Sequence, residues 1–251
     1  MSTTAATVNQ STSSASRAAL ALLCGCFVFS GFAALVYQTA WTRQFAIVFG
    51  TSELAVATVL AAYMGGLALG AWLAERWLPR IERPVFTYAW LELGIAASAL
   101  VAVPALLELS DAGLQALFGG QPAPPDSEAV GTSLFYLASA FVALAVPTTL
   151  MGATLPLLAR FAVADESQIA PRIGALYAMN TLGAVGGALV TAFALLPEFG
   201  LSRTLWFAAA CNAAAFILAM MLVRRLPYTP RPRGYDLEAP APTAAPRAPR
   251  A

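Results

Sequence analysis

The sequence contains no lysine and no histidine. All 14 basic residues are arginine, and they face 13 acidic residues, which gives a net charge of +1 at pH 7. Without histidine, the chain lacks the usual acid/base of neutral pH and the commonest protein ligand of transition metals. A net charge near zero also provides no overall field that would attract nucleic acid. We therefore expect no metal site, no cofactor and no nucleic-acid partner.

Charged residues are scarce as a class. They make up 11% of the sequence, whereas 59% of the residues are hydrophobic and the mean hydropathy is +0.70. Soluble domains usually hold about 25% charged residues. A bilayer core about 30 Å thick is crossed by about 20 apolar residues in a helix. The chain has six stretches of this kind, so we predict an all-α polytopic membrane protein with about six transmembrane helices, at about 18–40, 53–75, 85–108, 131–159, 171–197 and 201–223.

The two ends of the chain differ from this apolar middle. Residues 1–16 are rich in Ser, Thr and Ala and lack the basic start of a signal peptide. Residues 226–251 are rich in Pro, Ala and Arg and hold too little apolar surface for a core. We predict a disordered cytoplasmic leader at 1–16, a six-helix transmembrane domain at 17–225 and a disordered cytoplasmic tail at 226–251.

The distribution of arginine predicts the orientation. If the N-terminus lies in the cytoplasm, only Arg43 and Arg203 fall on the outer side, and the other twelve arginines fall on the inner side. Cytoplasmic loops of membrane proteins carry such an excess of basic residues. The sequence therefore predicts a multi-pass protein of the plasma membrane with both termini in the cytoplasm, and the lipid bilayer as its first partner.

Two G-x-x-x-G steps occupy matching places in the chain. Gly66 and Gly70 lie in the second expected helix, and Gly183 and Gly187 lie in the fifth. Each is therefore the second helix of a three-helix half, and two such halves would have opposite topology, as in many transporters. The alternative is that glycine simply lets membrane helices pack closely. The two interpretations are compatible.

Glu92 is the only acidic residue clearly inside an expected span. It lies about seven residues into the third span, about 10 Å deep at ~1.5 Å per residue. A carboxylate at this depth is costly, and it indicates a proton site, a cation site or the partner of an arginine. The alternative is a structural hydrogen bond or ion pair between helices.

Other polar residues could line a path beside Glu92. At the outer end of the first helix, Tyr37 and Trp41 share a face, with Gln38 and Arg43 close by. An aromatic belt with a snorkelling arginine explains this group, and contact with an anion or a lipid headgroup is the alternative. Asn180 places an amide in the glycine-rich fifth helix, where such groups line cavities or join helices.

No residues form a catalytic constellation. The three cysteines lie at Cys24, Cys26 and Cys211, and the first two point to nearly opposite sides of a helix. We interpret them as small buried hydrophobic residues. No nucleophile has an evident base beside it, so we expect no catalytic residue, and an integral membrane enzyme is the least favoured hypothesis.

The turn after the second helix carries a loop motif. Gly70, Glu75, Arg76 and Arg80 resemble the loop between helices two and three of the major facilitator superfamily, where a glycine, an acid and spaced arginines clamp neighbouring helices. The usual Gly-Arg after the turn is replaced by Trp77-Leu78-Pro79. The alternative is a generic basic turn on the cytoplasmic side.

Several motifs together resemble one family over about residues 20–225. It is the membrane portion of the bacterial spermidine-synthase-like proteins, also described as fused major-facilitator/spermidine-synthase proteins. The motifs are Ser30-Gly31-Phe32, Tyr37-Gln38 with Trp41 and Arg43, Phe49-Gly50-Thr51-Ser52, Tyr63-Met64-Gly65-Gly66, Met151-Gly152-Ala153-Thr154-Leu155-Pro156, and Gly174 with Asn180-Thr181-Leu182-Gly183.

The resemblance implies a soluble aminopropyltransferase-like domain after the helices. This sequence holds 26 residues after Arg225 and no glycine-rich loop that follows a strand. We therefore do not infer polyamine synthesis for this chain from the resemblance. The leading hypothesis is a non-catalytic module of the bacterial inner membrane that anchors or serves a separate spermidine-synthase-like enzyme and moves a polyamine or related molecule. The alternative is an independent small transporter, acting as a homo-oligomer of six-helix units.

Overall fold

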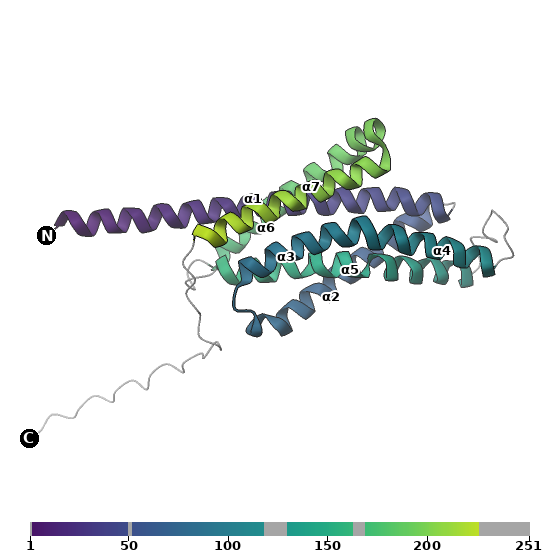
Figure 1. Ribbon diagram of the computed structural model, residues 1–251, viewed down its shortest axis with the longest axis horizontal. Coiled ribbons are helices and arrows are strands. Elements are labelled where there is room, and N and C mark those ends of the chain that lie inside the picture. Colours follow the sequence, from purple (N-terminus) through teal and green to yellow (C-terminus); the bar gives the residue numbers. More distant parts are fainter. Residues whose placement is uncertain (1, 50–51, 118–129, 163–168, 226–251) are drawn as a thin grey trace, which may run out of the picture.

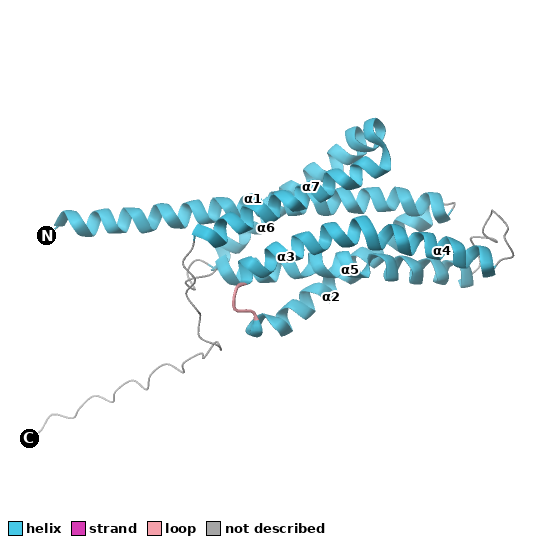
Figure 2. Ribbon diagram, viewed as in Figure 1, coloured by secondary structure: helices cyan, strands magenta, loops and turns pink. Residues whose placement is uncertain are grey.

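The computed structural model describes residues 2–49, 52–117, 130–162 and 169–225, and it is helical almost throughout these ranges (Figure 1, Figure 2). A short non-helical turn at residues 81–83 joins the second helix to the third. The elements are α1 (Ser2–Phe49), α2 (Ser52–Trp77), the 3-10 turn η1 (Leu78–Arg80), α3 (Pro84–Ala97), the π-helical turn η2 (Ser98–Ala102), α4 (Val103–Leu117), α5 (Val130–Ala162), α6 (Ile169–Val190), the π-helical turn η4 (Thr191–Leu195) and α7 (Leu196–Arg225).

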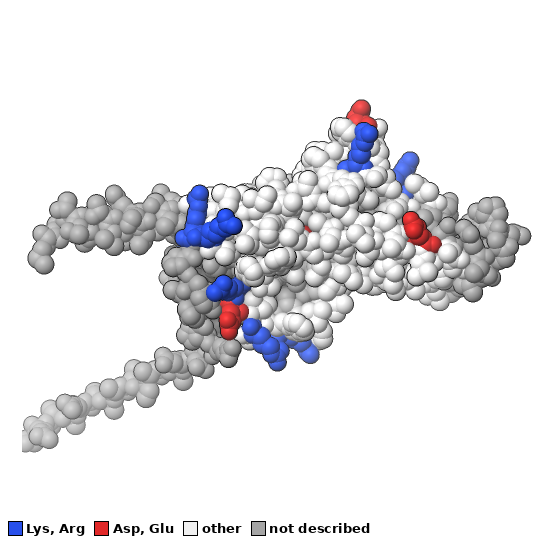
Figure 3. Space-filling model, in the orientation of Figure 1, with Lys and Arg blue, Asp and Glu red and all other residues white. Residues whose placement is uncertain are grey.

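Five of these helices are long and apolar enough to cross a membrane, by length and composition. They are Ala18–Ile47, Val56–Arg80, Pro84–Leu106, Leu137–Ala159 and Pro171–Arg225. The first four have 23 to 30 residues, which is about 35–45 Å of helix at ~1.5 Å per residue. Figure 3 shows charged side chains gathered toward the two ends of the bundle, with a broad uncharged band between them. These features are compatible with a multi-pass membrane protein.

The fifth stretch, of 55 residues, contains a reversal of the chain. Gly200 has a φ of 72° and a ψ of 179°, a conformation that residues with a side chain rarely adopt. Before it, α6 runs parallel to α1, since Gly183 packs on Val28 and Gly187 packs on Phe32. After it, α7 returns antiparallel to α1, and the bend lies at one end of the bundle (Figure 1).

Two segments extend further as helices than the sequence suggested. Residues 2–16, expected as a disordered leader, are the first part of α1, and they contain no proline or glycine that would end a helix. Residues 109–117, expected as loop, continue α4. The expected tail at 226–251 lies outside the described residues.

The glycine steps lie at two close helix contacts. In α2, a side chain at Gly66 would overlap the hydroxyl of Thr148 on α5, and Gly70 faces the backbone of Thr149. In α6, the corresponding glycines face the backbone of α1, at Val28 and Phe32. The glycines of α2 therefore pack on α5 and those of α6 pack on α1, each at a distance that only glycine allows.

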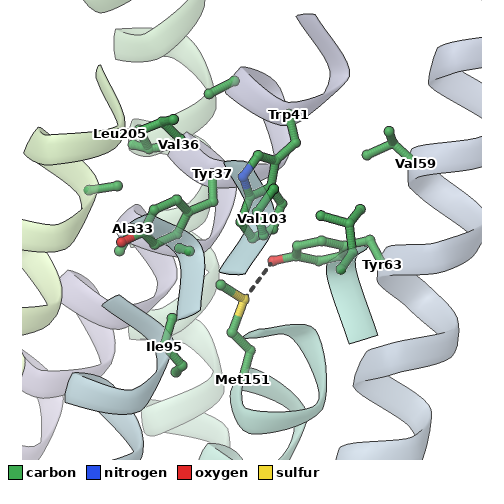
Figure 4. Close-up of a cluster of buried hydrophobic side chains, with 14 of the residues drawn as sticks. Ala33, Val36, Tyr37, Trp41, Val59, Tyr63, Ile95, Val103, Met151 and Leu205 are labelled. Carbon is green, nitrogen blue, oxygen red and sulfur yellow. Dashed lines mark hydrogen bonds between the residues drawn. The ribbon is translucent and has the colours of Figure 1, made fainter. Parts of the chain in front are cut away.

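Two clusters of buried side chains fill the bundle. The cluster around Tyr37, hereafter the Tyr37 cluster, is shown in Figure 4. Its large members include Val36, Tyr37, Trp41, Phe45, Val59, Tyr63, Ile95, Val103, Leu144, Met151 and Leu205. The second, the Tyr88 cluster, lies toward the N-terminal part of α1 and contains Leu23, Cys26, Phe27, Val85, Tyr88, Ala89, Leu158, Leu176, Ala219 and Leu222.

Candidate functional site

Glu92 is fully buried where the two clusters meet. It lies on the inward face of α3, whose buried residues are spaced three and four apart, as one face of a helix requires. They are Val85, Tyr88, Ala89, Glu92 and Ile95. This face packs against α7 and α5, so the carboxyl group is held in the interior of the bundle rather than at its surface.

Asn212 of α7 is the hydrogen-bond partner of Glu92. Its Nδ2 donates to Glu92 Oε2 over 2.6 Å, between residues 120 positions apart in the chain. The buried face of α7 beside it is built from small side chains, at Ala208, Cys211 and Ala215. These small residues let α7 approach α3 closely enough for two short polar side chains to meet.

The pair keeps two acceptor oxygens without a partner. Glu92 Oε1 and Asn212 Oδ1 are both buried and neither has a hydrogen bond of good geometry. Ser30 of α1 and Tyr88 of α3 lie beside the Glu92 carboxyl group, but neither makes a hydrogen bond of good geometry to Oε1. No arginine among the described residues forms an ion pair with this group. These two unpartnered acceptor oxygens could bind a small, positively charged ligand that has several hydrogen-bond donors. They could also bind a proton.

A second group of unpartnered polar atoms lies in the Tyr37 cluster and on the helices beside it. The rings of Tyr37 and Trp41 are stacked, with centroids 5.2 Å apart and planes at 16°. The Tyr37 hydroxyl, Trp41 Nε1, Gln44 Oε1 and Thr191 Oγ1 are buried without a hydrogen-bond partner. Figure 4 shows the Tyr37 and Trp41 rings together in the middle of the apolar cluster. Each orphaned buried group costs about 1–3 kcal/mol, so their concentration here requires an explanation.

The structure separates the path residues that the sequence suggested. Tyr37 and Glu92 are both fully buried in the interior of the bundle. Gln38 is half-buried, and its carbonyl oxygen accepts a hydrogen bond from Thr42. Arg43 is exposed. Asn180 is half-buried at the contact of α6 with α1, where its backbone and side-chain oxygens face Gly31.

Sequence reasoning did not single out Asn212, Gln44 or Thr191. The sequence could have identified Asn212, because this residue is a lone amide in a run of alanines on an apolar helix. It could also have identified Gln44, since this residue follows Tyr37 by seven residues and Trp41 by three, on the same helix face. Nothing in the sequence marks Thr191, because its role depends on a local π-helical turn.

The loop motif lies at the end of α2 and in η1. Gly70 packs on the backbone of α5, whereas Glu75, Arg76 and Arg80 are exposed. The guanidinium carbon of Arg76 lies 4.1 Å from the centre of the Trp72 ring, which is a cation–π contact. No ion pair joins these three charged residues to another residue in the described part of the chain. The motif therefore presents a basic surface next to exposed tryptophan.

The cysteines are free thiols. Cys26 is buried and its Sγ donates to the carbonyl oxygen of Ala215 over 3.7 Å, while its own carbonyl oxygen accepts from the Tyr88 hydroxyl over 3.3 Å. Within the described ranges, no three Cys, Asp or Glu side chains are grouped so that they could hold a metal ion. The candidate site therefore consists of Glu92 and Asn212, with the unpartnered groups of α1 beyond them.

Comparison of this chain with protein-family models, with curated proteins and with solved structures finds no match. The assignment of a function therefore depends on the geometry of the site.

Proposed function

We propose that the protein is an integral membrane carrier that binds a small cation at Glu92 and Asn212 and moves it across the bilayer. The observation that carries this proposal is the fully buried carboxyl group with one oxygen bonded to Asn212 and the other without a partner. A buried carboxylate is destabilising unless something compensates its charge. A bound cation or a proton supplies that compensation, and it must be released for transport to occur.

The architecture of such a carrier would be six crossings in two inverted triplets. The reversal at Gly200 supports two crossings in the last apolar stretch. The matching contacts of α2 with α5 and of α6 with α1 support the symmetry, because an inverted repeat exchanges these two pairs of helices. Glu92 would lie within the membrane, where transporters of this kind bind their substrates.

The charges at the two ends support an orientation with both termini in the cytoplasm. The end at which α2 and α7 finish carries the larger group of described arginines, Arg76, Arg80, Arg83, Arg172, Arg224 and Arg225. The opposite end carries Arg43, beyond the middle of α1, and Arg203, just after the bend. This excess fits the rule that basic residues remain on the cytoplasmic side of the plasma membrane.

The chemistry of the ligand favours an ammonium group. A primary ammonium has three donors, and the site offers two free acceptors next to a bonded carboxylate oxygen. The resemblance of the sequence to the membrane portion of spermidine-synthase-like proteins favours a polyamine or a related amine as the molecule that carries this group. A proton is the simplest competing occupant.

Transport assays with a charge-neutralising variant test the proposal. Purified protein in liposomes is given labelled putrescine or spermidine, and proton movement is followed in parallel with an internal pH dye. We expect Glu92→Gln to reduce amine flux by at least about tenfold, because Gln keeps the shape but not the charge. Glu75→Gln, at an exposed acid on α2, is the matched control and should leave the flux unchanged.

Each result of this assay has a clear meaning. Amine flux that depends on Glu92 supports the proposal, and proton flux alone with the same dependence changes the occupant to a proton. Equal flux of both probes in the wild-type protein and in Glu92→Gln would remove Glu92 from the mechanism and overturn the proposal.

A second candidate function is the anchoring of a separate aminopropyltransferase-like enzyme. It is favoured by the exposed basic surface at one end of the bundle, formed by Arg76, Arg80, Arg224 and Arg225, which could dock an acidic soluble partner. Co-purification from native membranes, with and without Arg→Gln substitutions at these positions, tests it. Recovery of no such enzyme with the wild-type protein would exclude this function.

A further inference from the structure

One face of α1 carries polar side chains from the Glu92 site toward the C-terminal end of the helix. Ser30, Tyr37, Trp41 and Gln44 are seven, four and three residues apart, so they share a face. Side chains on a helix lean toward its N-terminus, which brings the Tyr37 hydroxyl toward the level of Glu92. The Tyr37 ring stacks on the Trp41 ring one turn further along the helix.

Thr191 lies on the opposite wall of the same region. Gly187 of α6 packs on Phe32, and the two helices are parallel, so Thr191 lies one turn further along, near the level of Tyr37. Other threonines, such as Thr39 and Thr148, donate their hydroxyl hydrogen bonds to a carbonyl of their own helix. Thr191 opens the π-helical turn η4 and has no such partner. Such π-helical turns are frequent at functional sites.

The other side of Glu92 has a different character. In the Tyr88 cluster, the Tyr88 hydroxyl donates to Cys26 and the Cys26 thiol donates to Ala215. No described side chain of this cluster has a buried polar atom without a partner. The cluster therefore has all of its buried polar groups paired, and it separates Glu92 from the N-terminal end of the bundle.

We propose that the face of α1 with Tyr37, Trp41 and Gln44, together with Thr191, is the route between Glu92 and the C-terminal end of α1, and that the stacked rings of Tyr37 and Trp41 close it. The unpartnered oxygen atoms of Tyr37, Gln44 and Thr191 along this face replace, one after another, the water that a moving cation loses. Trp41 contributes the face of its ring, which attracts positive charge. Both rings are 0% exposed, so the route is shut in this conformation and opens when the rings separate.

The identity of the transported cation depends on the proposed function, but the route can be tested without a transport assay. The native Cys24, Cys26 and Cys211 are replaced by Ala, and single cysteines are then introduced at Ala33 or at Ala219. Both positions are alanines with 0% exposure, one in the Tyr37 cluster and one in the Tyr88 cluster, so they form a matched pair. A membrane-impermeant, positively charged thiol reagent is applied to each side of the membrane in turn.

We expect the reagent to modify Ala33→Cys only from the side on which Arg43→Cys, an exposed reference position, is modified. Adding Trp41→Ala should speed this modification by at least about tenfold, because the rate follows the population of the open route. From that same side, Ala219→Cys should stay unmodified. Trp41→Phe keeps a ring in place and should leave the rate close to that of the parent, provided that thermal unfolding shows both variants folded.

The proposal would be overturned if reagent added on the Arg43 side failed to modify Ala33→Cys both when Trp41 is present and when it is replaced by Ala. Equal modification of Ala33→Cys and Ala219→Cys would overturn it as well, because it would show general loosening instead of a route. The labelling result stands apart from the flux assay. A route without Glu92-dependent flux would contradict the carrier function alone, and flux without labelling would contradict the route alone.

Discussion

The Tyr37 and Tyr88 clusters fill the same bundle and share α1, yet they differ in whether their buried polar groups have hydrogen-bond partners. In the Tyr88 cluster, the phenol and the thiol both have backbone partners. In the Tyr37 cluster, the phenol and the indole of Trp41 have none, although both are as deeply buried. Glu92 and Asn212 lie between the two clusters. Asn212 Nδ2 donates to Glu92 Oε2, whereas Glu92 Oε1 and Asn212 Oδ1 have no hydrogen-bond partner.

This difference distinguishes buried polar groups that stabilise the fold from buried polar groups that serve a function. A buried hydroxyl with a partner adds about 1 kcal/mol to stability, whereas one without a partner costs about 1–3 kcal/mol. A fold that served stability alone would place Phe at Tyr37 and Val at Thr191. The cost is therefore concentrated on the side of Glu92 where we place the route, and the following variants test that contrast.

The largest effect is expected at the glycines that let two pairs of helices pack closely. Gly66→Ala would push a methyl group into the Thr148 hydroxyl, and Gly183→Ala would push one into the backbone of Val28. Overpacking costs about 1–3 kcal/mol, so both variants should lose thermal stability in detergent by similar amounts. Gly174→Ala, with nothing within 4 Å of the added carbon, should be neutral or slightly stabilising. A large difference between Gly66→Ala and Gly183→Ala would contradict the proposed symmetry of the two helix contacts.

The next effect is expected at the junction of the clusters. Asn212→Ala removes the donor to Glu92 Oε2 and leaves a buried carboxyl group without its bonded partner. We expect a stability loss of about 1–3 kcal/mol together with a loss of amine flux. Asn180→Ala is the matched control, because its amide lies at the α1–α6 contact, facing Gly31. If Asn180→Ala removed the flux and Asn212→Ala did not, the site would have to be moved to the α1–α6 interface.

A smaller effect is expected from the two tyrosine hydroxyls. Tyr88→Phe removes a hydrogen bond to Cys26 and should lower stability by about 1 kcal/mol. Tyr37→Phe removes an unpartnered hydroxyl, so the stability should stay the same or rise while the flux falls. Thermal unfolding and transport are measured on the same preparations. A stability loss in Tyr37→Phe as large as in Tyr88→Phe would show that Tyr37 has a structural role.

The smallest effect is expected from two threonines. Thr148→Val removes a hydrogen bond of 2.6 Å to the Leu144 carbonyl oxygen and should cost about 0.5–1 kcal/mol. Thr191→Val removes a hydroxyl without a partner and should be neutral or stabilising. Thermal unfolding compares the two. Equal losses would mean that the Thr191 hydroxyl has a partner, and that η4 is not part of a route.

Much of the helical architecture could be predicted from composition alone. Apolar stretches of membrane-spanning length appear directly in the sequence, because a helix that faces lipid must be apolar over its whole length. Charged side chains gather toward the ends of the bundle in the same way. The burial of Glu92 was expected for a similar reason, since a single acid in an apolar helix is rare enough to stand out.

The partner of Glu92 could not be predicted. Asn212 is 120 residues away, and the sequence offered Asn180 as an equally good amide. The choice depends on the reversal at Gly200, which turns α7 back beside α1, and on the packing of α7 against α3. Similarly, Trp41 and Arg43 are neighbours in the sequence, but one is 0% exposed and the other is exposed, because they lie on opposite faces of α1.

Local sequence is sufficient to predict which segments form helices long and apolar enough to span a membrane, and which acid is buried among them. These properties follow from local hydrophobicity, which each segment carries independently of the others. The contact of Glu92 with Asn212 arises only from packing, as does the contrast between the paired polar groups on one side of this contact and the unpartnered ones on the other. Those facts depend on which helix faces are in contact, and that is set by the glycine contacts and the chain reversal acting together.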